Sequence, residues 1–375
     1  MQSVKTYFIT GATGAIGTAL VPILLEDKNA RIKLLMRAKS TTELNARLET
    51  LYQFWKIGLE DSNFRERIQA IRGDVASPHF ELDELTYRGL CADCTHIIHS
   101  AGNVRMNLPL EQARRSAVGS AQNVVEFSRD CTRLEKIEFV STVGVGGHLA
   151  LVPETWLSKP RAFHNTYEQS KAEAEDYIRS EVEQGLPLTV HRPSMVVGDS
   201  RTGKIIHFQI FYYLCEFLSG RRTWGILPQL GGVQLDIIPV NVVAGAIAWS
   251  SRRIDTAGQI LHLCSGPEKS VKLLKLRELV RIAFVRSRLD VPAAIFDVPP
   301  RLFSALLSMS ARLSGVKMKR QILALPIFLD YLATRQTFQN VRTQKLLEVA
   351  TINIPDPQVY VEQVLDCYLD RKYGS

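Results

Sequence analysis

The chain has 375 residues, of which 46% are hydrophobic and 22% are charged, and it carries a formal net charge of +8. This composition is that of a folded globular protein, and it excludes a disordered chain, a collagen-like repeat and a small disulfide-stabilised protein. Because the positive excess is mild and spread along the chain, it favours anionic partners such as phosphates or an acidic protein over a nucleic acid.

Nothing in the sequence predicts a membrane span, since no run approaches about 18 uncharged apolar residues. Residues 1–5 lead directly into a strand-like run, without the apolar segment of a secretory signal. The six cysteines are scattered, which fits a reducing compartment. We therefore expect a cytoplasmic protein whose oligomeric state the sequence leaves open.

The first 200 residues alternate short apolar runs with amphipathic helical patterns. The runs are rich in isoleucine and valine, which predicts parallel strands buried on both faces by helices. The predicted strands are residues 6–10, 31–37, 67–74, 95–100, 136–142 and 188–197. Ser40 and Glu43 have the spacing of a capping box that opens a helix after the second strand. The pattern predicts a Rossmann-type, doubly wound parallel sheet.

The pattern changes after Gly198. The later segments are predicted as an aromatic-rich helix at 208–218, a loop at 224–235, strands at 236–240 and 259–263 with a helix at 241–249 between them, and mostly helical structure from 267 onwards. The aromatic residues of this region, Phe211, Tyr212, Phe217 and Trp224, would suit either an apolar ligand or an ordinary core.

A glycine-rich loop lies between the first predicted strand and the first predicted helix. Gly11, Gly14 and Gly17 permit a tight turn and let backbone amides approach a pyrophosphate at the helix N-terminus. Because the loop directly follows the strand, it favours a dinucleotide cofactor over a purely structural turn. The expected cofactor contacts in this loop are Thr10, Gly11, Thr13, Gly14, Ala15, Ile16 and Gly17.

The end of the second strand distinguishes the two nicotinamide cofactors. An acidic residue there would bind the ribose hydroxyls of NAD, but this strand ends in Arg37, with Lys39 just beyond. A guanidinium can pair with a 2′-phosphate in bidentate fashion, so NADPH is predicted; a solvated loop arginine is the alternative. Further contacts are expected after the third and fourth strands, at Asp74, Val75, Ala101, Gly102 and Asn103.

Tyr167 and Lys171 lie one turn apart on a predicted helix. The ammonium would lower the pKa of the phenol and could also hold a nicotinamide ribose. The fifth predicted strand ends in Ser141 and Thr142, which places a hydroxyl at the carboxyl edge of the sheet, where open α/β folds bind ligands.

Together, the glycine loop, the hydroxyl at the end of strand five and the Tyr167/Lys171 pair resemble the extended short-chain dehydrogenase/reductases. The resemblance covers roughly residues 1–200. It implies that Thr142, Tyr167 and Lys171 form the catalytic triad, with Ser141 as the less favoured hydroxyl, and that Lys171 also contacts the cofactor.

Residues 191–203, HRPSMVVGDSRTG, are similar to the R-P-x-x-V-x-G-D-S-x-T-G stretch of thioester reductases and related fatty acyl-CoA reductases. Residues 236–240, DIIPV, are similar to a second element of these enzymes. The resemblance implies cofactor contacts from Pro193, Ser194 and Val196. It also implies NADPH-dependent reduction of an acyl thioester to an aldehyde and, with a second NADPH, to an alcohol.

Because the chain begins at the first strand without a carrier-type serine motif, we expect the thioester to arrive on a separate acyl or peptidyl carrier protein or on coenzyme A. On this basis residues 1–200, with 236–265 returning to them, are predicted as the NADP-binding domain. Residues 201–235 and 266–375 are predicted as a smaller, mostly helical substrate-binding region.

Two other functions remain open for the same fold. One is an NADP-dependent epimerase, dehydratase or hydroxysteroid-type alcohol dehydrogenase that uses the same triad. The other is a non-catalytic NADP sensor, which the triad disfavours because binding alone does not require the phenol of Tyr167.

Three further features suggest structural roles. Cys91 and Cys94 precede His96 and His99, but these histidines fall on opposite faces of a strand, so no metal site is predicted. The basic segment 301–320 could contact a membrane surface, dock a carrier or cover an acyl tunnel, although a packed helix with a basic outer face is favoured. His148, His164 and His207 are isolated in the sequence and indicate core or surface positions.

Overall fold

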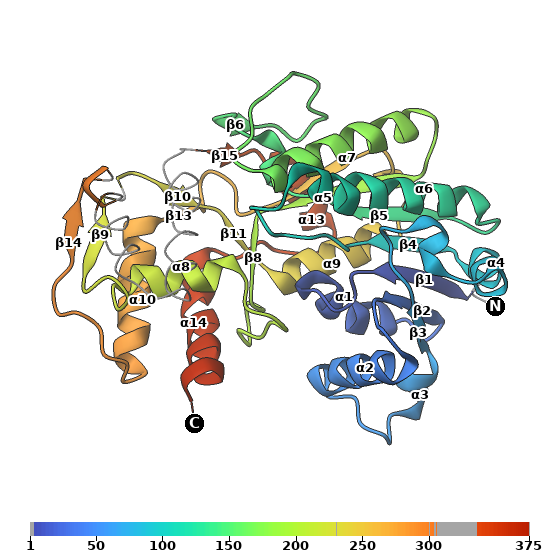
Figure 1. The fold of residues 1–375 in the computed structure, drawn as a ribbon, viewed down its shortest axis with the longest axis horizontal. Helices are drawn as coiled ribbons and strands as arrows, with labels where there is room; N and C mark the ends of the chain where they lie inside the picture. Colours follow the sequence, from blue (N-terminus) through green and yellow to red (C-terminus); the bar gives the residue numbers. More distant parts are fainter. Residues whose placement is uncertain (1–3, 230, 300, 304, 306–335, 375) are drawn as a thin grey trace.

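The computed structural model describes residues 4–229, 231–299, 301–303, 305 and 336–374. Seven parallel strands form its central sheet in the order β12-β7-β5-β4-β1-β2-β3 (Figure 1). They are β1 Lys5–Thr10, β2 Ala30–Met36, β3 Ile68–Arg72, β4 His96–His99, β5 Lys136–Val140, β7 Leu188–Pro193 and β12 Ile260–Leu263. The predicted Rossmann-type doubly wound sheet is confirmed.

Helices cover both faces of this sheet, because alternate strand residues point to opposite sides. Tyr7 and Ile9 of β1 join a core formed with α1, α2 and α9, whereas Phe8 joins a second core formed with α4, α6 and α7. The two helical layers are visible above and below the strands in Figure 1. The helices that cover the sheet are α1 Ala15–Leu25, α2 Thr41–Trp55, α4 Glu84–Asp93, α6 Ser120–Asp130, α7 Thr166–Glu183 and α9 Val240–Ser250.

Short helical turns complete this half of the molecule. They are α3 Ser62–Glu66, η1 Pro78–Glu81, α5 Leu110–Arg114, η2 Arg115–Gly119, η3 Val143–Gly146 and η4 Ile254–Thr256. The predicted capping box at α2 is confirmed in part: the Ser40 hydroxyl accepts a hydrogen bond from the Glu43 amide, while the Glu43 carboxylate accepts from the amide of Lys39 instead of Ser40.

The predicted strand at 188–197 is wrong as a single element. β7 ends at Pro193, and β8 Met195–Val197 leaves the sheet to pair with β11 Ile237–Pro239. The sequence run alone could not show this break, since the residues of both strands are almost all buried and the strands pair with different partners. The loop predicted at 224–235 likewise contains β9 Ile226–Pro228 and β10 Gln234–Leu235, which pair with β14 Phe296–Val298 and β13 Val271–Lys272.

The carboxyl-terminal region packs beside the sheet, at the left of Figure 1. It contains α8 Ile210–Leu218, α10 Leu273–Arg286 and α14 Pro357–Tyr373. Nearer the middle of the view, α13 Val341–Val349 lies close to β12, and β15 Thr337–Phe338 pairs with β6 Leu151–Val152. One hydrophobic core includes side chains of α1, α8, α9, α10 and α14, so the two predicted domains share a core, and the boundary between them remains a prediction.

The basic segment predicted at 301–320 lies almost entirely outside the described residues. Within the part of the chain that the structure covers, no helix is both long enough and apolar enough to cross a bilayer.

Candidate functional site

The residues predicted for the site lie at or next to the carboxyl ends of the parallel strands. Thr10 ends β1 and precedes the glycine loop, Arg37 follows β2, Asp74 lies two residues after β3, and Ala101 two residues after β4. Thr142 lies just beyond β5, and Pro193 ends β7. The structure therefore collects these positions at one edge of the sheet, where open α/β folds bind ligands.

Gly11 and Gly17 are required by close backbone contacts in the glycine loop. Gly11 has a φ of +78°, and a Cβ there would lie 2.5 Å from the Ala101 nitrogen. A Cβ on Gly17 would lie 2.5 Å from the Gly11 carbonyl oxygen. The first turn of α1 carries no acidic residue, and its N-cap, Gly14, is exposed and makes no side-chain cap. This cradle fits the pyrophosphate of a dinucleotide.

The residues at the end of β4 and just after it contact both Thr10, which precedes the glycine loop, and Lys171. The Thr10 hydroxyl lies 2.8 Å from Nδ1 of His99, and the Ser100 hydroxyl donates to the Thr10 carbonyl. A Cβ on Gly102 would lie 3.5 Å from Nζ of Lys171, so this backbone passes close to the ammonium. Asn103 is exposed, and its side chain accepts from the Arg105 amide.

Basic side chains gather at the ends of β2 and β3. Arg37 and Lys39 are both exposed, and Arg72 donates to the Lys39 carbonyl at 3.4 Å. Among the described residues, the guanidinium of Arg37 makes no hydrogen bond or ion pair, which leaves it available to a phosphate. Asp74 closes a turn by accepting from the Ala76 amide, and the Val75 carbonyl accepts from Asn123.

α7 brings Tyr167 and Lys171 to the end of β5. Its N-cap Asn165 accepts from the Glu168 amide, and the Thr166 hydroxyl donates to the Leu108 carbonyl at 2.8 Å. Nζ of buried Lys171 donates to the Val140 carbonyl at 3.0 Å. The helix start is thus fastened to the loop after β4, and the ammonium to the end of β5.

Burial controls the ionisation of the two groups. It lowers the pKa of Lys171 to about 8, although the Glu175 carboxylate opposes the shift. It raises the pKa of Tyr167 to about 12, against a lowering effect of the nearby Thr142 hydroxyl. The pKa of this phenol is therefore raised, where the sequence predicted that it would be lowered, because desolvation outweighs the effects of the neighbouring groups.

Thr142 is better placed than Ser141 to act as the hydroxyl. The Thr142 Oγ1 accepts from the Gly144 amide at 3.1 Å, so its own proton remains available for a ligand. The Ser141 side chain is 3% exposed, and its hydroxyl has no partner among the described residues. Thr142 is partly exposed, and a hydrogen bond from its side chain lowers the pKa of Tyr167.

Two charged residues of the recognised motifs are structural anchors, which sequence reasoning did not identify. Arg192 is fully buried, and its guanidinium pairs with Glu175 of α7 at 2.6 and 3.0 Å. Because Glu175 lies one turn after Lys171, this pair fixes α7 to β7. In the sequence, the one indication that Glu175 has a role near the site is its spacing from Lys171, which places both residues on the same face of the helix.

Asp236 anchors the loop after β12. Its two carboxylate oxygens accept from the amides of Ser265 and Gly266, each at 2.8 Å. Burial raises the pKa of Asp236 to about 6, against the effect of these amides and of Ser194. Ser194 and Val196, predicted as cofactor contacts, are both buried, the first just before β8 and the second within it.

The D-S-x-T-G stretch forms a tight turn. Oδ1 of Asp199 accepts from the amides of Arg201 and Thr202, and Ser200 bonds with Asn241 of α9. Gly203 has a φ of +69°, and a Cβ there would lie 2.3 Å from the carbonyl oxygen of Gln363 in α14. The motif therefore joins the sheet to the carboxyl-terminal helix.

The aromatic residues considered for an apolar ligand are divided between core and surface. Phe211, Tyr212 and Phe217 are buried in the core, and the Tyr212 hydroxyl accepts from the Gly198 amide. Trp224 is 81% exposed. Three of these side chains therefore belong to the hydrophobic core of the protein, and Trp224 lies on its surface.

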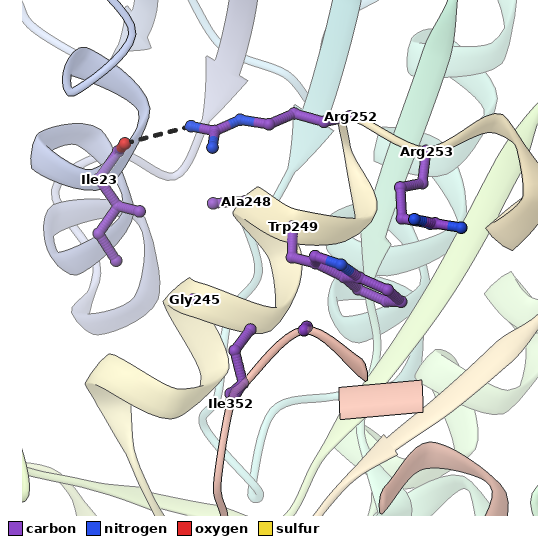
Figure 2. Close-up of a pocket in the computed structure, with 8 residues that line it drawn as sticks. Ile23, Gly245, Ala248, Trp249, Arg252, Arg253 and Ile352 are labelled. Atoms are coloured by element: carbon purple, nitrogen blue, oxygen red, sulfur yellow. Dashed lines mark hydrogen bonds between the residues drawn. The ribbon is translucent and has the colours of Figure 1, made fainter. Parts of the chain in front are cut away.

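A separate pocket of about 390 Å³ lies between α1, α9 and the turn after α13 (Figure 2). Ile23, Trp249 and Ile352 give it an apolar lining, and Arg252 reaches across to the Ile23 carbonyl. Because α1 and α9 both start near the carboxyl edge and run back toward strand beginnings, their last turns lie at the opposite end of the sheet. This pocket is therefore distinct from the candidate active site.

His96 and His99 of β4 point to opposite faces of the sheet, as the sequence predicts. His96 bonds with Thr95 and packs on Tyr7, whereas His99 bonds with Thr10 and stacks on Phe139. Burial lowers the pKa of His99 to about 3, so its imidazole is neutral.

The seven-stranded sheet, the glycine cradle and the Thr142/Tyr167/Lys171 arrangement define an NAD(P)-dependent oxidoreductase of the extended short-chain dehydrogenase/reductase class. The family model described as "Male sterility protein" matches residues 9–247, and the chain belongs to this family.

The curated relatives of the chain include a synthase and a reductase, both much longer than the chain. The chain is 32% identical over 225 residues, 59% of its length, to an isonitrile lipopeptide synthase of Streptomyces coeruleorubidus. It is 23% identical over 283 residues, 70% of its length, to the L-2-aminoadipate reductase of Schizosaccharomyces pombe. The chain spans only 15% of the first of these relatives and 19% of the second.

Among solved structures, the terminal R domain of the myxalamid PKS-NRPS pathway matches with a TM-score of 0.83 and 25% identity, over all of this chain and 92% of that one. The yeast methylglyoxal/isovaleraldehyde reductase complexed with NADPH matches with a TM-score of 0.66 at 16% identity, over 99% of this chain and 100% of that one, which shows the shared fold.

Proposed function

We propose that this protein reduces an acyl thioester, carried by a carrier protein or coenzyme A, to an aldehyde with NADPH, and that Thr142, Tyr167 and Lys171 are its catalytic residues. The observation that carries the proposal is the convergence of these side chains with the glycine cradle at one edge of the sheet. The match to a terminal reductase domain along the whole chain supports the substrate class.

Each side chain has a distinct role in this reaction. The glycine loop and Lys171 would hold a nicotinamide cofactor, which would supply a hydride to the carbonyl carbon of the thioester. Tyr167, whose raised pKa keeps it protonated at neutral pH, donates a proton to the carbonyl oxygen, which gives a hemithioacetal. When the C–S bond of this hemithioacetal breaks, its oxygen returns the proton to Tyr167, the aldehyde forms, and the departing thiolate takes a proton from water. The Thr142 hydroxyl donates a second hydrogen bond to the same oxygen, since the Gly144 amide occupies its acceptor side. Lys171 is charged below pH 8 and lies ready to hold the cofactor ribose.

The preference for NADPH rests on the basic end of β2. The guanidinium of Arg37 is exposed and has no partner among the residues that the structure describes, so it suits a 2′-phosphate, and Lys39 and Arg72 add positive charge nearby. The remaining proposed cofactor contacts are the glycine loop, the segments after β3 and β4, and Pro193, Ser194 and Val196.

Substitution of Tyr167 by phenylalanine tests whether the site is catalytic. With NADPH and medium- or long-chain acyl-CoA or acyl-carrier protein, we expect Tyr167→Phe to lose about 100-fold or more in kcat. NADPH affinity, measured by fluorescence, should stay within about twofold, because binding does not need the phenol. Tyr177→Phe, on the same helix, is the matched control and should retain activity. Full activity of Tyr167→Phe would show that the triad assignment is wrong, and an inactive wild-type protein that still binds NADPH would favour the sensor.

A further inference from the structure

A buried carboxylate lies directly beside the triad. Glu168 follows Tyr167 at the start of α7 and is 3% exposed. Its Oε2 lies 3.1 Å from the His164 backbone nitrogen and 3.0 Å from Nδ1 of the same residue, whose side chain is buried as well. Burial raises the pKa of Glu168, and the contacts with His164 oppose that shift. A buried carboxylate without hydrogen-bond partners would destabilise the fold, so the two contacts with His164 stabilise Glu168 in this position.

The other side of Glu168 contacts the turn that carries Thr142. A Cβ on Gly144 would lie 3.1 Å from Cγ of Glu168 and 3.4 Å from Oγ1 of Thr142. The Gly144 amide is also the donor that orients the Thr142 hydroxyl, at 3.1 Å. The Glu168 side chain therefore packs against the backbone that sets the position of Thr142.

The same two segments are joined again a few residues away. The His148 amide donates to the Ala162 carbonyl at 3.0 Å, and the His148 and His164 rings are 4.0 Å apart, so neither histidine is isolated in the fold. Gly147 has a φ of +55°, and a Cβ there would lie 2.1 Å from the Ala162 oxygen. The backbone after β5 and the segment before α7 thus form one continuous contact.

We propose that Glu168, held by His164, is a positioning residue that fixes the Thr142 hydroxyl relative to the Tyr167 phenol, so that both groups reach the same carbonyl oxygen. This inference rests on the thioester reduction proposed above. Glu168 does not touch the substrate; it acts through the Gly144 backbone. A displacement of about 1 Å in such a site can reduce the rate about 100-fold.

Kinetics of Glu168→Ala, Glu168→Gln and His164→Gln test the proposal. We expect Glu168→Ala to lower kcat about 10- to 100-fold, with the KM for the thioester and the affinity for NADPH within about twofold of wild type. Glu168→Gln keeps the shape and can still bond with His164, so it should restore kcat to within about threefold of wild type. His164→Gln removes the imidazole partner and should lower kcat less than Glu168→Ala.

Glu173→Ala is the matched control. Glu173 lies on the same helix and pairs with Arg114 at 2.7 and 2.8 Å, away from Thr142, so its loss should leave kcat unchanged. If Glu168→Ala retains wild-type kcat, or loses thioester and NADPH affinity together with kcat, or if Glu168→Gln fails to rescue, the positioning role is overturned.

Hydrogen exchange tests the contact without any enzymatic assay. In Glu168→Ala the amides of residues 143–147 should exchange about tenfold faster than in wild type and in Glu173→Ala. Unchanged exchange would overturn the inference whatever the activity. Accelerated exchange in a protein that does not reduce thioesters would uphold the contact while contradicting the proposed function.

Discussion

At the scale of single residues, burial sets the protonation states of the two ionisable side chains of the site. Lys171 and Tyr167 both lie at the edge of the sheet, and desolvation moves their pKa values in opposite directions, to about 8 and about 12. The neutral phenol is the form that can donate a proton, and the ammonium is the form that can hold a ribose. Both forms coexist only below pH 8, so the pH dependence of the enzyme reports on Lys171.

We therefore expect kcat/KM, which reports the free enzyme, to be high at neutral pH and to fall as the pH rises through about 8. The sign follows from the lowered pKa of Lys171, because its ammonium loses a proton above that value. The measurement is a pH profile of kcat/KM between pH 6 and 10, with circular dichroism at each pH to confirm that the protein is folded. A profile that is flat up to pH 10 would contradict this role of Lys171.

Arg37 carries the expected preference for NADPH. Arg37→Ala should weaken NADPH binding about 10- to 100-fold and leave NADH binding within about twofold, since a charge-assisted contact contributes about 1.5–3 kcal/mol. Arg31→Ala is a suitable control, because Arg31 is exposed near the opposite end of the same strand. Equal effects of Arg37→Ala on both cofactors would show that this guanidinium does not contact the 2′-phosphate.

At the scale of the elements, the glycine loop is held against the end of β4. Gly11→Ala would force a side chain into a left-handed backbone conformation and within 2.5 Å of the Ala101 nitrogen. We expect it to lower the free energy of unfolding by about 2 kcal/mol or more. Gly14→Ala, whose Cβ would lie 3.2 Å from the Gly11 oxygen at a φ of −81°, should cost clearly less. Urea denaturation measures both, and equal losses would show that the close approach to β4 is unimportant.

Sequence periodicity could predict the sheet, because most of its parallel strands are short runs rich in apolar residues that are buried on both faces. The positions of Gly11, Thr142, Tyr167 and Lys171 followed from that order, since carboxyl ends of parallel strands meet at one edge. The break at Ser194 could not be predicted, since β8 continues the buried run of β7 and only its pairing with β11 separates it from the sheet.

Contacts between segments that are distant in the sequence could not be predicted either. Arg192 with Glu175, and Asp236 with Ser265, are pairs that only the fold brings together. The raised pKa of Tyr167 depends on surrounding atoms from several elements, so adjacency to Lys171 on the helix predicted the wrong direction.

At the scale of the whole molecule, the sheet and the carboxyl-terminal helices share one core, and the D-S-x-T-G turn contacts both α9 and α14. The carboxyl-terminal helices are therefore packed directly against the half of the molecule that contains the sheet. The match to a terminal reductase domain along the entire chain agrees with this arrangement.

The most direct test of the central claim follows NADPH absorbance and released thiol together, with acyl-CoA and with acyl-carrier protein as substrates. We predict that both signals change together and depend on Tyr167, with one NADPH per thiol for an aldehyde product and two for an alcohol. If neither thioester releases thiol while the same protein reduces a ketone or oxidises an alcohol with NADP, the chain is not a thioester reductase.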